Sequence, residues 1–133
     1  MAVSVYDAKD CTVTVDGVFV TGFGEDMISG EKEEDLFDPS VGAQGDTVAA
    51  VTNNTLGTIT LSVQVTSPQK GYLMGLANRR DPFPLWCINK ALNERIGGTM
   101  AKLRTFPDMS RGASPEDMEF AFTVFDYVCE STE

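Results

Sequence analysis

Histidine is absent from the sequence of 133 residues. Without it the chain cannot form the Ser/His/Asp and Cys/His nucleophile pairs, the HExxH zinc site or an imidazole proton shuttle. Cysteine is scarce, and the three thiols at Cys11, Cys87 and Cys129 form no CxxC pair. A thiol redox motif and a four-cysteine zinc site are therefore excluded as well. Any catalysis would have to use carboxylates, lysine, tyrosine or a bare thiolate.

Long apolar runs and ligand-binding motifs are also missing. The sequence has no stretch of about 18 apolar residues and no signal-peptide pattern, so we expect no membrane span and synthesis in a reducing cytoplasm. The glycines complete neither a phosphate-binding loop nor a GxGxxG motif, and the acids do not match a calcium-binding loop. We therefore expect no cofactor, no metal and no enzymatic activity. A carboxylate pair, which is defined by distance in space, is the remaining catalytic option.

Basic residues are few: ten Lys and Arg stand against twenty Asp and Glu, which gives a formal net charge of −10. Such a protein repels the phosphate backbone, so a nucleic-acid reader that works by phosphate neutralisation is excluded. The charge is also segregated, with −9 in residues 1–66, +5 in residues 67–113 and −6 in residues 114–133. A solvated face is the simplest interpretation of each single run. Separate acidic and basic patches, however, allow a protein to dock on copies of itself in a fixed orientation.

Alternating residues predict a mostly β fold. Residues 11–15 and 18–20 flank Asp16-Gly17, which is the sequence of a tight hairpin turn. Residues 58–66 alternate apolar and polar side chains, as a strand with one wet face does, and residues 46–51 are expected to be its hairpin partner. Three further strands are expected at residues 85–90, 98–106 and 118–128.

One helix is expected at residues 68–80. Ser67 supplies an N-cap, Pro68 is suited to the first helical position, and Pro82 ends the helix. The length of the chain suits one domain with one core. The sequence therefore predicts a single domain, residues 1–133, that is mainly β with one flanking helix (α+β). Its sheet is expected to be an antiparallel barrel or sandwich of about six or seven strands.

Residues 22–46 are expected to form a long extended acidic arm. This segment is rich in glycine and acids, and it is longer than the connections of up to about 12–15 residues that compact domains usually contain. Four apolar side chains are its expected anchors on an adjacent subunit: Met27, Ile28, Leu36 and Phe37. The alternative is a strand pair or flap that folds back on its own domain.

The order of these features is specific enough to compare with a known family. It comprises the first hairpin, the acidic arm with Gly42-Ala43-Gln44-Gly45-Asp46, the strand at 58–66, Ser67-Pro68 with Tyr72-Leu73-Met74-Gly75-Leu76-Ala77, and Pro82-Phe83-Pro84-Leu85-Trp86. From Tyr6 to Val128 the chain resembles the tail tube proteins of contractile-tailed bacteriophages, which are small virion proteins. The resemblance implies a β-barrel or sandwich with a flanking helix, assembled as six-membered rings. Stacked rings would form the DNA conduit inside a contractile sheath.

The resemblance also implies partners and a location. The partners are further copies of the chain, the tail sheath protein, and the baseplate and tail terminator proteins. The location is the tail of the virion, after assembly in the host cytoplasm. No enzymatic activity is implied.

Charge gives the resemblance a physical interpretation. DNA would be cargo that is not bound, because carboxylates along a lumen repel phosphates. The candidate residues for an acidic channel or surface are Glu25, Asp26, Glu31, Glu33, Glu34 and Asp35. The candidate residues for a basic interface, which would face an acidic block of a neighbour, are Arg79, Arg80, Lys90, Arg95, Lys102 and Arg104.

Other functions fit the same features. A tail terminator, a head–tail adaptor or a baseplate ring uses the same type of fold, and the number of copies per particle would separate it from a tube. A small ligand-binding β-barrel or a carboxylate-dependent hydrolase would instead be a monomer with a deep pocket.

Overall fold

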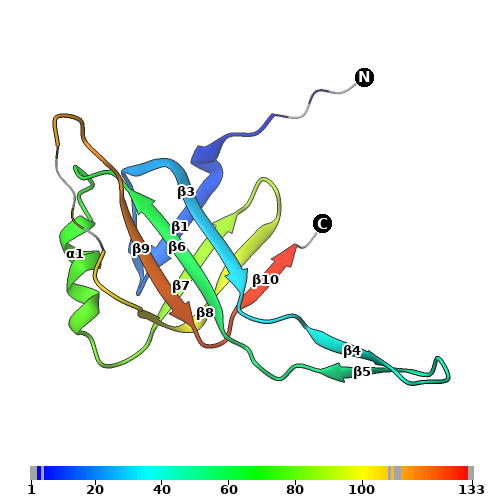
Figure 1. Ribbon diagram of the computed structural model, residues 1–133. Helices are drawn as coiled ribbons and strands as arrows, with labels where there is room; N and C mark the ends of the chain where they lie inside the picture. The colour runs from blue at the N-terminus through cyan, green and yellow to red at the C-terminus, as the bar shows by residue number, and fades with distance from the viewer. Residues whose placement is uncertain (1–2, 4, 108, 110–111, 132–133) are drawn as a thin grey trace.

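The computed structural model describes residues 3, 5–107, 109 and 112–131, and it shows a curled sheet with a short helix against it (Figure 1). In this described part, eight strands form one antiparallel sheet in the order β2-β1-β7-β8-β9-β6-β3, with β10 also paired to β8, while β4 and β5 form a separate pair. The prediction of a mainly β, α+β fold with an antiparallel sheet is confirmed. The strands are β1 (Cys11–Val15), β2 (Val18–Phe19), β3 (Phe23–Lys32), β4 (Phe37–Val41), β5 (Thr47–Val51), β6 (Gly57–Val63), β7 (Phe83–Asn89), β8 (Glu94–Leu103), β9 (Met118–Val124) and β10 (Val128–Ser131).

Strand β6 shows how the sequence pattern becomes packing. Its inward side chains Ile59, Leu61 and Val63 are fully buried, and the Thr and Ser residues between them are half-buried on the outer face. The predicted strand is therefore confirmed, but its predicted hairpin partner is wrong. Both edges of β6 are occupied, by β3 and β9. Since no edge of β6 is left, Thr47–Val51 pairs with Phe37–Val41.

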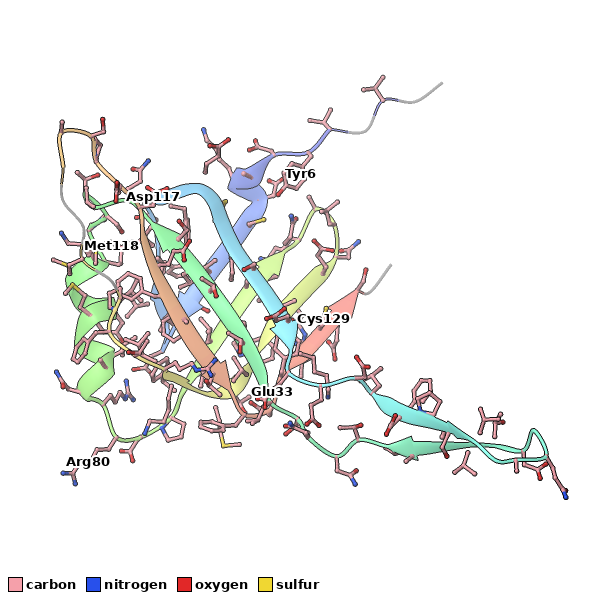
Figure 2. All side chains as sticks on the ribbon, in the orientation of Figure 1. Tyr6, Glu33, Arg80, Asp117, Met118 and Cys129 are labelled. Carbon is pink, nitrogen blue, oxygen red and sulfur yellow. The ribbon has the colours of Figure 1, made fainter. Side chains whose placement is uncertain are left out.

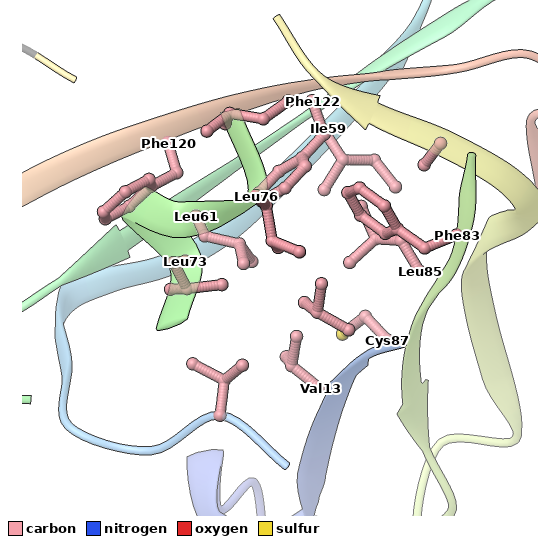
Figure 3. Packing of buried hydrophobic residues seen from close by; sticks show 14 of the residues in the cluster. Val13, Ile59, Leu61, Leu73, Leu76, Phe83, Leu85, Cys87, Phe120 and Phe122 are labelled. Carbon is pink, nitrogen blue, oxygen red and sulfur yellow. The ribbon is translucent and has the colours of Figure 1, made fainter. Parts of the chain in front are cut away.

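The core fills the concave side of the curled sheet (Figure 3). Phe83 of β7 and Phe122 of β9 meet edge to face, with ring centroids 6.0 Å apart. Leu73 and Leu76 reach this core from the helical segment. Removing each large side chain of this kind from water stabilises the fold by about 1.5–3 kcal/mol.

The helical segment is shorter than the expected range 68–80. Its α-helical part, α1, spans Lys70–Gly75, and a single 3-10 turn, η2, spans Leu76–Asn78. Two glycines within these few residues weaken the helix. The expected N-cap does not form either, because the Ser67 hydroxyl donates to the Thr21 carbonyl at 2.6 Å. A second 3-10 turn, η1 (Ala8–Asp10), precedes β1.

Of two predictions about turns, one is confirmed and one is wrong. The hairpin at Asp16-Gly17 is confirmed: both residues have positive φ, 53° and 79°, as a tight turn between β1 and β2 requires. The prediction of one continuous strand at 118–128 is wrong, because a turn at residues 125–127 separates β9 from β10. Asp126 leaves the ladder there and accepts hydrogen bonds from the backbone N–H groups of Thr99 and Met100, both at 3.0 Å.

Candidate functional site

The described part of the chain shows no metal site and no unpaired polar side-chain atom in its interior. No three His, Cys, Asp or Glu side chains among them lie close enough to hold a metal ion. No buried side-chain N or O atom in this part of the chain lacks a hydrogen-bond partner. No helix formed by these residues is long and apolar enough to cross a membrane. The features that call for explanation lie on the surface.

The most prominent of them is a β-hairpin that projects from the domain (Figures 1 and 2), which we call the arm and define as residues 33–56. Every residue of its strands β4 and β5 is exposed. At its tip the Gly42 N–H donates to the Asp46 carbonyl at 2.7 Å. Opposed residues of an antiparallel pair share a face, so one face of the arm carries a largely apolar set: Phe37, Pro39, Val41, Thr47, Ala49 and Val51.

This apolar face has no cover within the described chain. The exposed fractions of its large side chains are 52% for Phe37, 69% for Val41 and 73% for Val51, and two apolar side chains of the arm outside this face, Leu36 and Val48, are 68% and 62% exposed. The arm also has five acids and no base: Glu33, Glu34, Asp35, Asp38 and Asp46. A lone two-stranded hairpin is marginally stable in water, and gathered exposed apolar groups mark interaction sites. The arm is therefore the strongest candidate for contact with another molecule.

The structure divides the expected anchors between two places. The projection begins at Glu33 rather than near residue 22, because residues 23–32 form β3 of the main sheet. Leu36 and Phe37 lie on the arm, as described above. Ile28 pairs with Leu61 and packs against the core, and Met27 beside it is half-buried. Their positions in the sheet leave only two of the four side chains available as arm anchors.

The acidic candidates divide in the same way. Three of them, Glu33, Glu34 and Asp35, are exposed where the arm leaves the domain. Glu25 and Glu31 are exposed on β3. The side chain of Asp26 lies outside the described set.

The basic candidates do not form one patch. Lys90 lies in the turn between β7 and β8, and Arg95, near the start of β8, is ion-paired with Glu130 at 2.7 Å. The guanidinium of Arg95 also lies 4.9 Å from the centre of the Trp86 ring.

The other four bases belong to a different part of the sheet. Arg79 and Arg80 follow η2, which contacts β8, and Lys102 and Arg104 lie near the end of β8. Arg79 is ion-paired with Asp16. The other three basic candidates in this part of the sheet are Arg80 and Arg104, which are exposed, and Lys102, which is half-buried.

Strand β3 offers a second surface. It pairs with β6 along one side, and no other described strand pairs with it. Unpaired backbone N–H and C=O groups on an edge are a template for strand addition. A register shift between Phe23 and Ile28 distorts the first part of the edge, so the regular part is Ile28–Lys32.

The three thiols help to line a hollow of about 420 Å³. The Asn89 side-chain amide donates to Cys11 Sγ at 3.3 Å. Burial, followed by the nearby Cys11 and Glu94, raises the pKa of Cys87 to about 11. A thiol with this pKa is protonated at neutral pH, so Cys87 is not an activated nucleophile.

A turn that sequence reasoning did not single out holds the root of the arm. The Tyr127 N–H donates to the Thr55 carbonyl at 3.0 Å, and the Thr55 hydroxyl donates to the Phe125 carbonyl at 2.6 Å. The available sequence signal was Asp126, a charged residue between two aromatic residues, Phe125 and Tyr127.

Comparisons with known proteins give structural relatives only. No protein-family model and no curated protein matches the chain. The chain is similar to the sheath/tube terminator of an extracellular contractile injection system, PVC, in its extended state. The TM-score is 0.71 and the identity 12%, over 98% of this chain and 100% of that one.

Two further solved structures are similar. One is the anti-feeding prophage cap (AFP tube terminating cap), with a TM-score of 0.63 and 15% identity over 99% of this chain and 95% of that one. The other is a chain of the PVC sheath–tube complex in the extended state, with a TM-score of 0.64 and 17% identity over 95% and 91%. None of the three descriptions denotes an enzyme. At these identities the likeness shows the fold: the chain has the fold of parts of contractile injection systems.

Proposed function

We propose that the chain is a structural subunit of a contractile tail or contractile injection particle, and that it terminates the tube. The observation that carries this proposal is the TM-score of 0.71 with the PVC sheath/tube terminator, with nearly full coverage of both chains. The likeness to a tube terminating cap supports the same position. The sheath–tube chain has a lower TM-score than the PVC terminator, 0.64, and its match covers less of both chains, 95% and 91%. A terminator therefore replaces the tube subunit as the favoured interpretation.

The two exposed surfaces support assembly with other copies. The arm and the free edge of β3 belong to one chain, but they are different from each other, so a contact that uses them is head-to-tail. Head-to-tail contacts close into a ring when the rotation between copies allows it. We propose a ring of six copies, seated on the last ring of the tube and in contact with the sheath. This ring belongs to the tail and is assembled in the host cytoplasm.

Charge supports a passive relation to DNA. With a net charge of −10 on each copy, the ring would repel a duplex that passes through it and would not bind it.

Segregation of charge would also help to orient neighbouring copies. We propose that acidic Glu33, Glu34 and Asp35 of one copy face bases of another, such as Lys102 and Arg104.

A tube subunit is the second candidate, because the likeness to the sheath–tube complex favours it. Electron microscopy and mass measurement of the purified protein distinguish the two. Single closed rings that do not stack support a terminator, and long hollow tubes support a tube subunit. A protein that stays monomeric at high concentration contradicts both.

A further inference from the structure

The arm leaves the domain through two legs, residues 33–36 and 52–56. The legs are joined to each other, since the Glu33 N–H donates to the Leu56 carbonyl and the Thr52 N–H donates to the Leu36 carbonyl, both at 3.0 Å. These bonds keep the arm two-stranded down to its root. They do not fix the angle between the arm and the sheet, because both partners belong to the arm.

A third segment connects the arm to the domain. The turn at residues 125–127 lies between β9 and β10, and in Figure 1 it passes beside the point where β3 and β6 give way to the arm. It holds one residue of the second leg, Thr55, at two points: the Tyr127 N–H donates to the Thr55 carbonyl and the Thr55 hydroxyl donates to the Phe125 carbonyl. Two hydrogen bonds to the same residue restrain its rotation as well as its position.

The ring of Tyr127 occupies the space at the base of both legs. A β-carbon at Gly57, the first residue of β6, would overlap the Tyr127 ring, and one at Gly30 of β3 would come within 2.9 Å of its hydroxyl oxygen. Gly30 and Gly57 are thus positions where the absence of a side chain makes room for this ring. Tyr127 is half-buried and packs against the core cluster. The ring therefore packs against both strands that lead into the arm.

The turn is itself anchored to β8. The Asp126 carboxylate accepts hydrogen bonds from the N–H groups of Thr99 and Met100, both at 3.0 Å, and from the Thr99 hydroxyl at 2.5 Å. Partial burial opposes ionisation of Asp126, but these hydrogen bonds outweigh it and hold its pKa below the ordinary value. The chain of contacts thus runs from β8 through Asp126 and Tyr127 to Thr55 of the arm.

We propose that the turn at residues 125–127 is a positioning element that fixes the direction in which the arm leaves the domain. The arm then meets its partner as a pre-oriented unit, which lowers the entropy lost on binding. The geometric part of this inference concerns the isolated chain. Only its consequence for assembly rests on the proposed function.

Distance measurement by pulsed electron paramagnetic resonance tests the inference. One spin label is placed at Ala43 on the arm tip and one at Asp117 on the domain, through unnatural amino acids that leave the native thiols unmodified. The labelled protein is diluted into unlabelled protein, so that only distances within one copy are measured. The parent should give a narrow distribution. Tyr127→Ala should broaden it by about twofold or more, because the base of the legs loses the ring that packs against it.

Matched variants separate positioning from folding. Tyr127→Phe keeps the ring and should keep the narrow distribution. Thr55→Val keeps the shape of the side chain but loses the hydroxyl, and it should broaden the distribution less than Tyr127→Ala does. Circular dichroism verifies that each variant is folded, and if Tyr127→Ala is not, Thr55→Val and Asp126→Asn carry the test. Distributions as narrow as that of the parent in every folded variant other than Tyr127→Phe would overturn the inference. A fixed arm in a protein that forms no rings would contradict the proposed function and leave this inference standing.

Discussion

Strands β5 and β6 follow one another in the chain, yet they differ in what their side chains contact. Every second residue of β6 is buried, whereas every residue of β5 is exposed. β6 lies between two strands of the main sheet, and β5 pairs with β4 alone in the described structure. Both sequences favour a strand, since both are rich in β-branched residues.

This difference indicates what the apolar side chains of each strand pack against. The apolar side chains of β6 contribute to a core that the chain builds by itself. Those of β5 and β4 remain in water within one copy, where they add little to its stability. We infer that their contribution is made against another molecule, which is the central claim of our account.

The largest expected effect separates the core from the arm. Phe122→Ala should lower the free energy of unfolding by about 3–5 kcal/mol, because Phe122 is fully buried against Phe83. Phe37→Ala removes a phenyl ring from the arm and, in protein dilute enough to be monomeric, should change that free energy by less than about 0.5 kcal/mol. Urea denaturation followed by the fluorescence of Trp86 measures both. Equal losses would show that the arm packs on its own domain.

Glycine substitutions should give a smaller contrast. Gly97 has a φ of 141°, and a β-carbon there would overlap the Leu85 carbonyl of the adjacent strand. Gly97→Ala should therefore lower the free energy of unfolding by more than about 2 kcal/mol. Gly45 at the arm tip has a φ of 92° but open space around it, so Gly45→Ala should cost only the backbone strain, about 1–2 kcal/mol. Thermal unfolding of both variants makes the comparison, and a larger loss at Gly45 would reverse it.

The smallest expected effect concerns the ion pair on β8 and β10. The side chains of Arg95 and Glu130 are 47% and 44% exposed, so their coupling should be below about 1 kcal/mol. A double-mutant cycle with Arg95→Met and Glu130→Gln measures it. A coupling well above that value would mean that this pair is part of the core's stability.

The sequence predicted those features that depend on local patterns. Alternation identified β6, and the Asp16-Gly17 pair identified the first hairpin, because each depends on neighbouring residues. The partner of Thr47–Val51 could not be predicted in this way, since alternation does not say which strand fills an edge. The acidic and apolar character of the arm was visible, but its limits depended on β3 pairing with β6 far along the chain. The turn at residues 125–127 was missed because its only sequence signal is one carboxylate, Asp126. The groups that bind this carboxylate, the N–H groups of Thr99 and Met100, lie on another strand.

The most direct test of the central claim compares the parent protein with a triple variant, Leu36→Ser, Phe37→Ser and Val51→Ser. All three side chains are more than half exposed, so the variant should unfold at the same urea concentration as the parent when both are dilute enough to be monomeric. Sedimentation velocity then measures assembly. Our account predicts discrete rings for the parent and monomers for the variant. A variant that is equally stable and assembles as the parent does would contradict the claim that the arm is the assembly element.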